Sequence, residues 1–341
     1  MGEVSTPPDA IVIAVDGGGS KTDGVALDAS GHVIAQARRA GSSPHMLELD
    51  PAVQIVHELV TELRAAAGNP PILQTNVYIS GLDLPTEVTA FTDRVRTLPW
   101  ASGLGGERLV VGNDMFALLR AGTAEPNAIA VVCGTGINCL GVRDDGERAR
   151  FAALGAISGD WGGGWALGEQ ALWHAARDVD GRGEPTSLTG AVPAYLGLPD
   201  VQAVIEAFHF GRLPSEKLAE LAPLVLEASD AGDAVAHSIL DRQAKEIVDF
   251  AVAALKRLEL LKRSVPVVLG GGVLATGNER LVTGVNRQLS ERAPLARAVL
   301  VQSRPILGGA LLALESIGAP DSALETARAA LVGSLATAGS R

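Results

Sequence analysis

The stretch AVDGGGSKTDGVALD, residues 14–28, joins two apolar segments through three consecutive glycines. A glycine turn followed by Lys-Thr is typical of phosphate-binding loops. A Walker A loop, however, has glycine directly before its lysine and continues into a helix, whereas here Ser20 precedes Lys21 and the residues after Thr22 predict a strand. The dinucleotide fingerprint is excluded as well, since no helix begins after Gly19. The stretch therefore predicts a strand–turn–strand unit whose backbone amides can hold an anion.

The length and composition are those of a globular protein with more than one domain. The chain has 341 residues, 47% of them hydrophobic and 20% charged, which is enough to bury large cores. A net charge of −11 without any Lys/Arg cluster argues against nucleic acid or a membrane surface as a partner. No apolar run reaches the length of about 18 residues that a membrane helix needs. The start lacks a secretory signal and the two cysteines make no disulfide framework, so we expect a cytoplasmic protein.

The first third of the chain alternates short apolar runs with helical periodicity. This pattern predicts strands at 11–15, 24–28, 32–39, 76–80 and 108–112 and helices at 52–68 and 114–122. Later in the chain we predict helices at 214–232, 233–263, 308–318 and 322–336 and strands within 264–275 and 297–303.

A second strand–turn–strand unit follows the first. Residues 127–146 repeat the pattern of residues 11–31: an apolar strand, a glycine turn, a strand and a charged turn. We interpret this repeat as an internal duplication, although any two such hairpins resemble each other to some degree. The predicted domains are therefore 1–117 and 118–341, the second one larger because of a helical insertion. The C-terminal helix is a candidate to pack back on the first domain.

Four glycine turns are candidates for ligand contact: DGGGSKT, CGTGIN, SGDWGGGW and LGGGVLA. Glycine lets a backbone approach a phosphate closely, and the hydroxyls of Ser20, Thr22 and Thr135 can donate to its oxygens. Lys21 is either a phosphate contact or a solvated turn residue. Residues 270–275 formally match a relaxed dinucleotide pattern, but they do not open a βαβ unit, so a contact to adenosine is preferred. A plain turn is the alternative for any single loop.

Three aspartates lie where chemistry is expected. Asp114, in GNDMFALL, lies at a strand-to-helix junction and could accept the proton of a bound hydroxyl, although aspartate is also a common helix cap. Asp160, in SGDWGGGW, could contact substrate hydroxyls or cap a helix. Asp16 could hold Mg²⁺ through water, because Mg²⁺ prefers oxygen ligands.

In this order the motifs resemble those of the actin-like ATPase superfamily, and within it the BadF/BadG/BcrA/BcrD ATPase family with its N-acetylglucosamine kinases. DGGGSKT and CGTGINC resemble its two phosphate motifs, GNDMFALLRAG the segment with the catalytic aspartate, and LGGGVLATGNERL the adenosine motif. GDWGGGWALGEQAL resembles a further stretch that is written GDEGS-x-YWIG in these kinases. The resemblance covers residues 10–318. It implies an α/β fold of two ribonuclease H-like (actin-like ATPase) domains with a central cleft.

The resemblance also implies ATP and Mg²⁺ as cofactors, a small-molecule sugar as substrate and a homodimer as the assembly. Asp114 would be the base on the sugar hydroxyl, with Mg²⁺ at Asp16. The sugar site would comprise Ser43, His45, Asp114, Asn138 and Asp160. The nucleotide site would comprise Asp16, Gly17, Gly18, Gly19, Ser20, Lys21, Thr22, Gly134, Thr135, Gly136, Gly270, Gly271 and Gly272.

The sugar-contacting segments depart from the family pattern. In Ser-Ser-Pro-His-Met, residues 42–46, Pro44 replaces an amide side chain and Met46 a tryptophan, and Trp161 stands where an acid is expected. We therefore predict a kinase that phosphorylates the 6-hydroxyl of a hexosamine or hexose. N-acetylglucosamine is the first candidate, and a different sugar is the alternative.

Two other classes of function stay open. An ATPase that activates an iron–sulfur dehydratase or reductase would use cysteines, and the chain has Cys133 and Cys139. A regulatory protein with a degenerate site is the other alternative, which the altered sugar segment permits.

Overall fold

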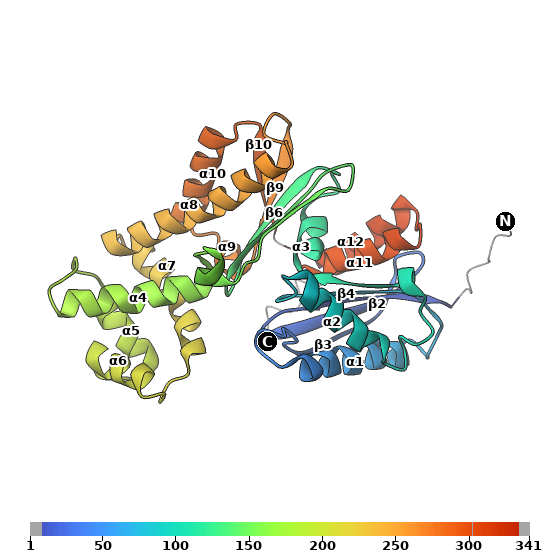
Figure 1. The fold of residues 1–341 in the computed structure, drawn as a ribbon, viewed down its shortest axis with the longest axis horizontal. Helices are drawn as coiled ribbons and strands as arrows, with labels where there is room; N and C mark the ends of the chain where they lie inside the picture. The colour runs from blue at the N-terminus through green and yellow to red at the C-terminus, as the bar shows by residue number, and fades with distance from the viewer. Residues whose placement is uncertain (1–8, 302, 334–341) are drawn as a thin grey trace. The chain divides into compact units, whose positions relative to one another are not determined.

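A computed structural model describes residues 9–301 and 303–333, and these fall into two units (Figure 1). Unit 1 joins the chain up to Ala124 to the segment from Val301 onward, and unit 2 is Glu125–Leu300. This division differs from the predicted domains 1–117 and 118–341. Unit 2 begins a few residues later, and the C-terminal helices belong to unit 1 because their apolar side chains cover its sheet.

Unit 1 is built on a five-stranded sheet with the order β3-β2-β1-β4-β5. β1, β2 and β3 are antiparallel neighbours, whereas β1, β4 and β5 run parallel. The centre of the sheet is buried on both faces, as the continuous apolar run of β1 predicts, and β3 alternates like an edge strand. The strands are β1 (Ile11–Gly17), β2 (Lys21–Asp28), β3 (Val33–Ala40), β4 (Ile72–Ile79) and β5 (Leu109–Asn113).

Helices cover both faces of this sheet. The side chains of α1 (Leu49–Ala66) and α2 (Pro85–Arg96) pack on one face, and those of α11 (Ile306–Ser316) and α12 (Asp321–Gly333) pack on the other. Each large aliphatic side chain buried in this way stabilises the fold by about 1.5–3 kcal/mol.

α3 (Met115–Gly122) lies directly against α11. A Cβ at Gly308 would be 1.8 Å from the carbonyl oxygen of Ala117. The two helices therefore touch through their backbones, and only glycine fits at this position. The short 3₁₀ segment η1 (Gly106–Arg108) precedes β5.

Unit 2 repeats the topology of unit 1. Its sheet has the order β10-β9-β6-β7-β8. β6 pairs antiparallel with β7 and parallel with β9, as β1 pairs with β2 and β4. The predicted duplication and the predicted α/β fold of two similar units are thus confirmed. The strands are β6 (Ala128–Cys133), β7 (Ile137–Val142), β8 (Arg148–Arg150), β9 (Val265–Gly270) and β10 (Ala296–Leu300).

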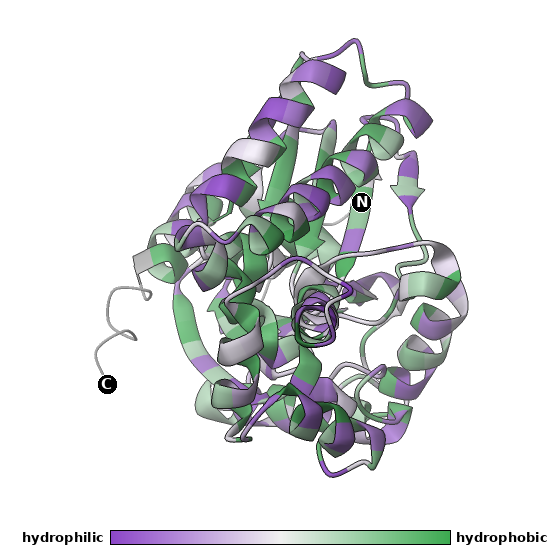
Figure 2. Cartoon of the chain, turned by 90° about the vertical axis from the view of Figure 1, so that its left-hand side faces the viewer, coloured by the Kyte–Doolittle hydropathy of each residue, from purple (hydrophilic) through white to green (hydrophobic). Residues whose placement is uncertain are grey.

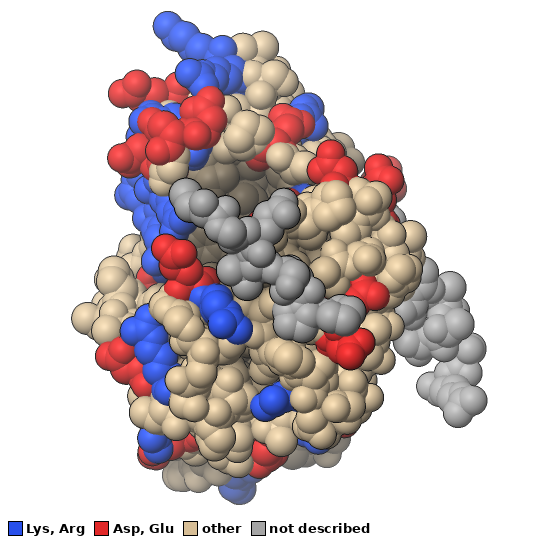
Figure 3. Space-filling view, turned by 90° about the vertical axis from the view of Figure 1, so that its right-hand side faces the viewer, with Lys and Arg blue, Asp and Glu red and all other residues tan. Residues whose placement is uncertain are grey.

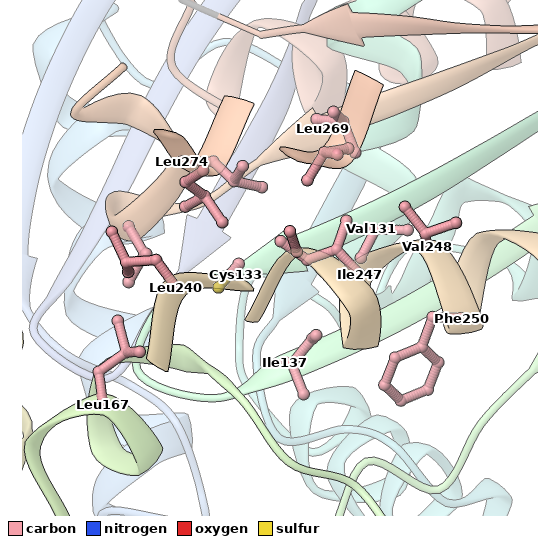
Figure 4. Close-up of a cluster of buried hydrophobic side chains, with 14 of the residues drawn as sticks. Val131, Cys133, Ile137, Leu167, Leu240, Ile247, Val248, Phe250, Leu269 and Leu274 are labelled. Carbon is pink, nitrogen blue, oxygen red and sulfur yellow. The ribbon is translucent and has the colours of Figure 1, made fainter. Parts of the chain in front are cut away.

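The described part of unit 2 carries more helices than that of unit 1. Leu240 and Ile247 of α8 lie in its core near Val131 and Leu269 of the sheet (Figure 4). In Figure 2 the strands are mainly hydrophobic, whereas the helices mix hydrophobic and hydrophilic residues. None of the described helices is long and apolar enough to cross a membrane. The helical segments are η2 (Gly155–Ser158), α4 (Gly163–Val179), α5 (Leu188–Leu196), α6 (Val201–His209), η3 (Ser215–Leu221), α7 (Ala222–Asp230), α8 (Ala234–Arg257), α9 (Gly272–Ala275) and α10 (Glu279–Arg292).

Candidate functional site

The first glycine turn joins β1 to β2 in unit 1. The N–H of Gly18 donates to the carbonyl of Lys21 at 2.8 Å, and the carbonyl of Gly18 accepts from the N–H of Ser42 at 3.0 Å. A Cβ on Gly17 would lie 2.2 Å from the Ser42 hydroxyl oxygen, so this position requires glycine. Ser20 and Lys21 are exposed beside the turn, as is Gly19. The loop is therefore fixed by its neighbours and presents backbone and two polar side chains to solvent.

Thr22 is turned into the protein instead. Its side chain is fully buried, and its hydroxyl donates to the carbonyl of Ala40 at 2.7 Å and lies 2.8 Å from the Ser42 hydroxyl. The hydroxyl is thereby engaged within the fold, and the expectation that Thr22 donates to a phosphate is not met. Its role is to hold the segment after β3 against the glycine turn.

Asp16 is the next-to-last residue of β1 and lies opposite Asp23 of β2 in the strand register. Residues paired in this way project from the same face of a sheet. Asp23 is bonded by Arg38, whose Nε is 2.6 Å from Oδ1, and by Arg304 just before α11. Burial opposes the ionisation of Asp23, but the hydrogen bonds from the two arginines lower its pKa overall. Asp23 is therefore a fixed negative charge beside Asp16.

The environment of Asp16 favours its neutral form unless a cation is near. Burial raises the pKa of Asp16 to about 8, the charges of Asp114 and Asp23 act in the same direction, and Lys21 and Arg304 oppose them. Among the described residues no group of three or more His, Cys, Asp or Glu side chains could hold a metal. A single carboxylate of this kind fits Mg²⁺, which keeps several waters and binds one or two carboxylates together with phosphates.

Asp114 follows β5 and precedes α3. Its side chain makes no capping hydrogen bond to the helix; Asn113 Oδ1 accepts the N–H of Met115 at 3.0 Å instead. The alternative role of Asp114 as a helix cap is therefore not supported. Burial raises the pKa of Asp114 to about 7, and the charge of Asp83 adds to this effect. The carboxyl is half-buried, so it is shielded from water yet reachable.

Asp83, whose charge acts on this carboxyl, belongs to a group of polar side chains from the segments after β3 and β4 and from the end of β5. Asn113 Nδ2 donates to Asp83 Oδ1 at 2.9 Å. His45 Nε2 lies 3.0 Å from Glu87 Oε1, and its Nδ1 is 3.9 Å from Asp83 Oδ2. Burial opposes the ionisation of Glu87, but hydrogen bonds from the Leu84 N–H and from His45 lower its pKa. The predicted residue His45 is thus oriented by two acids that the sequence did not single out.

Ser43, the other residue predicted from this segment, is buried, with a relative exposure of 4%. A Cβ on Gly81 would lie 2.8 Å from its hydroxyl oxygen and 2.9 Å from His45 Cγ. The segment 42–46 therefore packs closely on the residues that follow β4. Asp83 could have been found from its position, because it follows a buried parallel strand, where polar groups of α/β sites gather.

In unit 2 the second glycine turn, Gly134–Gly136, joins β6 to β7 and supports two other turns. The N–H of Gly164 donates to the carbonyl of Gly134 at 2.7 Å, and the N–H of Trp165 donates to that of Thr135 at 2.9 Å. A Cβ on Gly271 would lie 2.4 Å from the carbonyl oxygen of Cys133. The predicted motifs CGTGIN, SGDWGGGW and LGGGVLA are thus brought together within one unit.

Part of this assembly is open. A Cβ added to Gly134, Gly136 or Gly272 would meet no atom of the described parts of the chain within 4 Å, and Thr135 is exposed. An exposed turn of glycine and threonine with free approach to its backbone suits a phosphate group. Gly270 ends β9 and Gly271 has φ +97°, which fits its tight contact with the β6 end.

Asp160 lies just before α4 but does not cap it, because the cap residue is Gly162. The Asp160 carboxylate accepts the Ser158 hydroxyl. Its neighbour Trp161 packs on the core, and the Arg242 guanidinium lies 3.8 Å from the centre of its ring. The acid expected at position 161 is thus replaced by an aromatic–cation pair. Asn138 Oδ1 accepts the N–H of Cys139 at 2.6 Å.

The two cysteines are core residues. Both are buried, and burial raises the pKa of the Cys133 thiol to about 12 and that of Cys139 still further. Cys133 lies among Val131 and Ile137 in the core of unit 2 (Figure 4). Protonated thiols in an apolar core are poor ligands for an iron–sulfur cluster.

Charged side chains are interspersed on the surface. On the face drawn in Figure 3, the described acidic and basic residues alternate and leave wide uncharged areas. This mixture differs from the one-signed basic surface of nucleic-acid-binding proteins.

Comparisons with known proteins agree with the motif order. The model of the BadF/BadG/BcrA/BcrD ATPase family matches residues 13–313. An N-acetyl-D-glucosamine kinase from Dictyostelium discoideum is 29% identical over 90% of this chain and 98% of its own length. An N-acetylmuramic acid/N-acetylglucosamine kinase from Clostridium acetobutylicum is 26% identical over 89% of this chain and 97% of its own length. The crystal structure of a candidate N-acetylglucosamine kinase from Chromobacterium violaceum has 25% identity and a TM-score of 0.69, covering 90% of this chain and 100% of that one.

Proposed function

Because the chain belongs to the BadF/BadG/BcrA/BcrD ATPase family, we propose that it is an ATP-dependent sugar kinase. The observation that carries the proposal is the state of Asp114, a half-buried carboxyl that makes no capping bond and has its pKa raised to about 7. A group whose pKa lies near the working pH is best suited to accept a proton from a hydroxyl. The relatives from Dictyostelium discoideum and Clostridium acetobutylicum, both sugar kinases by name, support the same class.

In the proposed reaction the oxygen of a sugar hydroxyl forms a bond to the γ-phosphorus of ATP. The bond from that phosphorus to the bridging oxygen breaks, and ADP keeps the electron pair. Asp114 takes the hydroxyl proton and orients the oxygen. Asp16 would hold Mg²⁺ through water, and the ion when bound would neutralise phosphate charge. The positive charge of Lys21, which acts on Asp16, would also neutralise phosphate charge.

The glycine turns are proposed to bind the nucleotide. In unit 1 the fixed turn Gly17–Gly19, with Ser20 and Lys21 exposed, is suited to phosphate oxygens. In unit 2 the open backbone of Gly134–Gly136 is suited to phosphate. The turn Gly270–Gly272, which is open at Gly272, is suited to adenosine. Thr22 is left out of this set because its hydroxyl bonds within the fold.

The acceptor is proposed to be a hexosamine phosphorylated at its 6-hydroxyl, with N-acetylglucosamine as the first candidate. His45, held by Glu87, and Asp160, which accepts the Ser158 hydroxyl, are the polar groups proposed to meet sugar hydroxyls. Ser43 and Asn138 are also proposed to contact the sugar. Ser43 is buried, and the side-chain oxygen of Asn138 accepts the neighbouring N–H of Cys139.

A substrate panel tests the proposal. ADP release is followed with ATP, Mg²⁺ and, in turn, N-acetylglucosamine, N-acetylmannosamine, N-acetylmuramic acid, glucosamine and glucose. We expect turnover that depends on at least one N-acetylated hexosamine and on Mg²⁺. ATP consumption that is independent of every sugar would contradict the kinase proposal.

The same preparation separates the remaining alternatives. A brown, iron-containing protein from purification without air would favour the ATPase that activates an iron–sulfur enzyme, for which the buried thiols give no support. Sugar binding without ATP use would favour a regulatory protein. We further propose that the protein is cytoplasmic and that it forms a homodimer. Light scattering tests the homodimer directly.

A further inference from the structure

Gln243 is a polar residue on a buried, apolar face. It lies on α8, where the other buried side chains are all aliphatic or aromatic, and its own exposure is 0%. Leu240 and Ile247, one helical turn before and after it, point into the core of unit 2 near Cys133 and Ile137 (Figure 4). Burying a primary amide at such a position is unfavourable unless the amide makes a bond that the protein needs.

The bond that Gln243 makes goes to the backbone before α4. Its Oε1 accepts the N–H of Gly163 at 2.9 Å, and both atoms are buried. Its Nε2 is buried as well and has no hydrogen-bond partner among the residues that the structure describes. The orientation of the amide follows from this pair, since the opposite one would set two donors against each other. The amide nitrogen of Gln243 is thus left unpaired within the described residues while its oxygen serves as the acceptor for Gly163.

Gly162 and Gly163 adopt conformations that other residues rarely take, with φ +144° and +81°. A Cβ on Gly162 would lie 2.7 Å from Gln243 Nε2, and one on Gly163 would lie 2.4 Å from the carbonyl oxygen of Gly136. The amides that follow, Gly164 and Trp165, donate to the carbonyls of the 134–136 turn. A continuous series of contacts therefore leads from α8 to that turn.

We infer that Gln243 is a positioning residue for the glycine turn Gly134–Gly136. By holding Gly162 and Gly163 it fixes the donors that bind the carbonyls of the turn, and thereby the direction of the turn's own N–H groups. The inference rests on the proposed function in one respect, namely that this turn binds nucleotide phosphate.

The test compares variants by nucleotide affinity and by stability. Gln243→Met keeps the length of the side chain but lacks the acceptor. Gln243→Glu keeps an oxygen at the same place. Ile247→Val is the matched control, because it alters the same buried face of α8 without removing a bond to Gly163. Binding of ADP with Mg²⁺ is measured by calorimetry, and folding by circular dichroism and Tm.

We expect Gln243→Met to weaken ADP binding about tenfold, because a misplaced turn loses its aligned donors. Gln243→Glu should stay within about threefold of the wild type, as an acceptor is still present. Ile247→Val should lower the Tm and leave ADP affinity unchanged. Should Gln243→Met not fold, Gln243→Asn, whose shorter side chain withdraws the acceptor, gives the same comparison.

Wild-type affinity in a folded Gln243→Met variant, with only its Tm lowered, would overturn the inference and leave Gln243 a structural residue. A wild-type protein that binds ADP but phosphorylates no sugar would contradict the proposed function alone, since the binding comparison still reports on Gln243. A wild-type protein that binds no nucleotide would overturn both.

Discussion

Two carboxyl groups of unit 1, Asp16 and Asp114, have raised pKa values for the same physical reasons. Burial disfavours the charge of each, and neighbouring carboxylates add to the effect. Their proposed roles nevertheless differ. At Asp16 the charges of Lys21 and Arg304 oppose the rise in pKa and favour the ionised form that a cation binds. At Asp114 the opposing groups are the backbone N–H groups of Asp114 and Met115, and this carboxyl is suited to a proton.

Replacing Asp114 by Asn removes the proposed base while keeping the shape of the side chain. We expect kcat to fall by about 10²–10⁴-fold, with ADP affinity close to that of the wild type. Initial-rate kinetics and calorimetry measure the two effects. Asp50→Asn, an exposed acid of the same unit paired with Arg94, is the control and should keep its activity. Near-normal turnover of the Asp114 variant would show that another group is the base.

The decline of kcat/KM at acidic pH tests whether Asp83 raises the pKa of Asp114. The base must be ionised, so kcat/KM should decline as the pH falls below about 7, the pKa of Asp114. Asp83→Asn removes a negative charge that raises this pKa and keeps an oxygen for Asn113. We expect the decline to move to lower pH by about 1 unit. A profile unchanged from that of wild type and Asp50→Asn would mean that Asp83 does not act on Asp114.

At the scale of helices and strands, the sequence predicted what local patterns determine. The apolar runs of β1, β4 and β9 and the long periodicity of α8 were sufficient. The predicted helix 214–232 is instead η3 followed by α7, because Pro223 can begin a helix but cannot continue one. α2 was missed since it is mostly polar, although Pro85 and Glu87 mark its start and Glu87 accepts the N–H of Leu84.

The start of α8 depends on one carboxylate. Asp233 Oδ1 accepts the N–H groups of Val235 and Ala236, and Oδ2 accepts from Thr186 and Ser187 before α5. We expect Asp233→Ala to cost about 2 kcal/mol or more of unfolding free energy in urea at pH 7. Asp200→Ala, which removes a cap of α6 with one bond, should cost about 1 kcal/mol.

The sign of the pH dependence follows from the pKa of Asp233. Burial opposes its ionisation, but the hydrogen bonds from these backbone and hydroxyl groups lower the pKa to about 2. Its contribution is therefore present above the unfolded value of about 4 and is lost as the pH falls toward 2. The difference between wild type and Asp233→Ala should shrink over that range. A constant difference would mean that the charge of Asp233 is not what stabilises the helix start.

At the scale of the whole molecule, the chain leaves unit 1 near Ala124 and returns near Val301. Unit 2 is thus a continuous segment, and unit 1 is not. We expect a fragment of residues 125–300 to unfold cooperatively on its own. A fragment of residues 1–124 should not, because Leu307, Leu311 and Leu314 of α11 would no longer cover Val12 and Ala14 of the sheet. Thermal melts followed by circular dichroism measure both, and a cooperative melt of the shorter fragment would contradict this expectation.

The duplicated topology could be predicted because each strand–turn–strand unit is local and its glycines are visible in the sequence. The sequence made the last helix a candidate to pack on the first domain, but the return of α11 with it could not be derived, since the apolar residues of α11 indicate that this helix is buried but not against which sheet. The same limit applies to the candidate site. The positions of the candidates Asp16 and Asp114 at the ends of strands could be predicted from the sequence. The partners of Thr22 and the contribution of Asp83 could not, because they depend on residues far away in sequence.

The backbone contact between Gly308 and Ala117 has a consequence for protein synthesis. α3, which begins directly after Asp114, has no packing partner in α11 until residues 306–316 leave the ribosome. At about 5–20 residues per second, the delay after α3 is made amounts to roughly 10–40 s. During that time unit 2 can fold, whereas the apolar face of the unit 1 sheet is not yet covered by α11. The carboxylate proposed as the base is thus among the earlier residues to be made and among the last to be set in place.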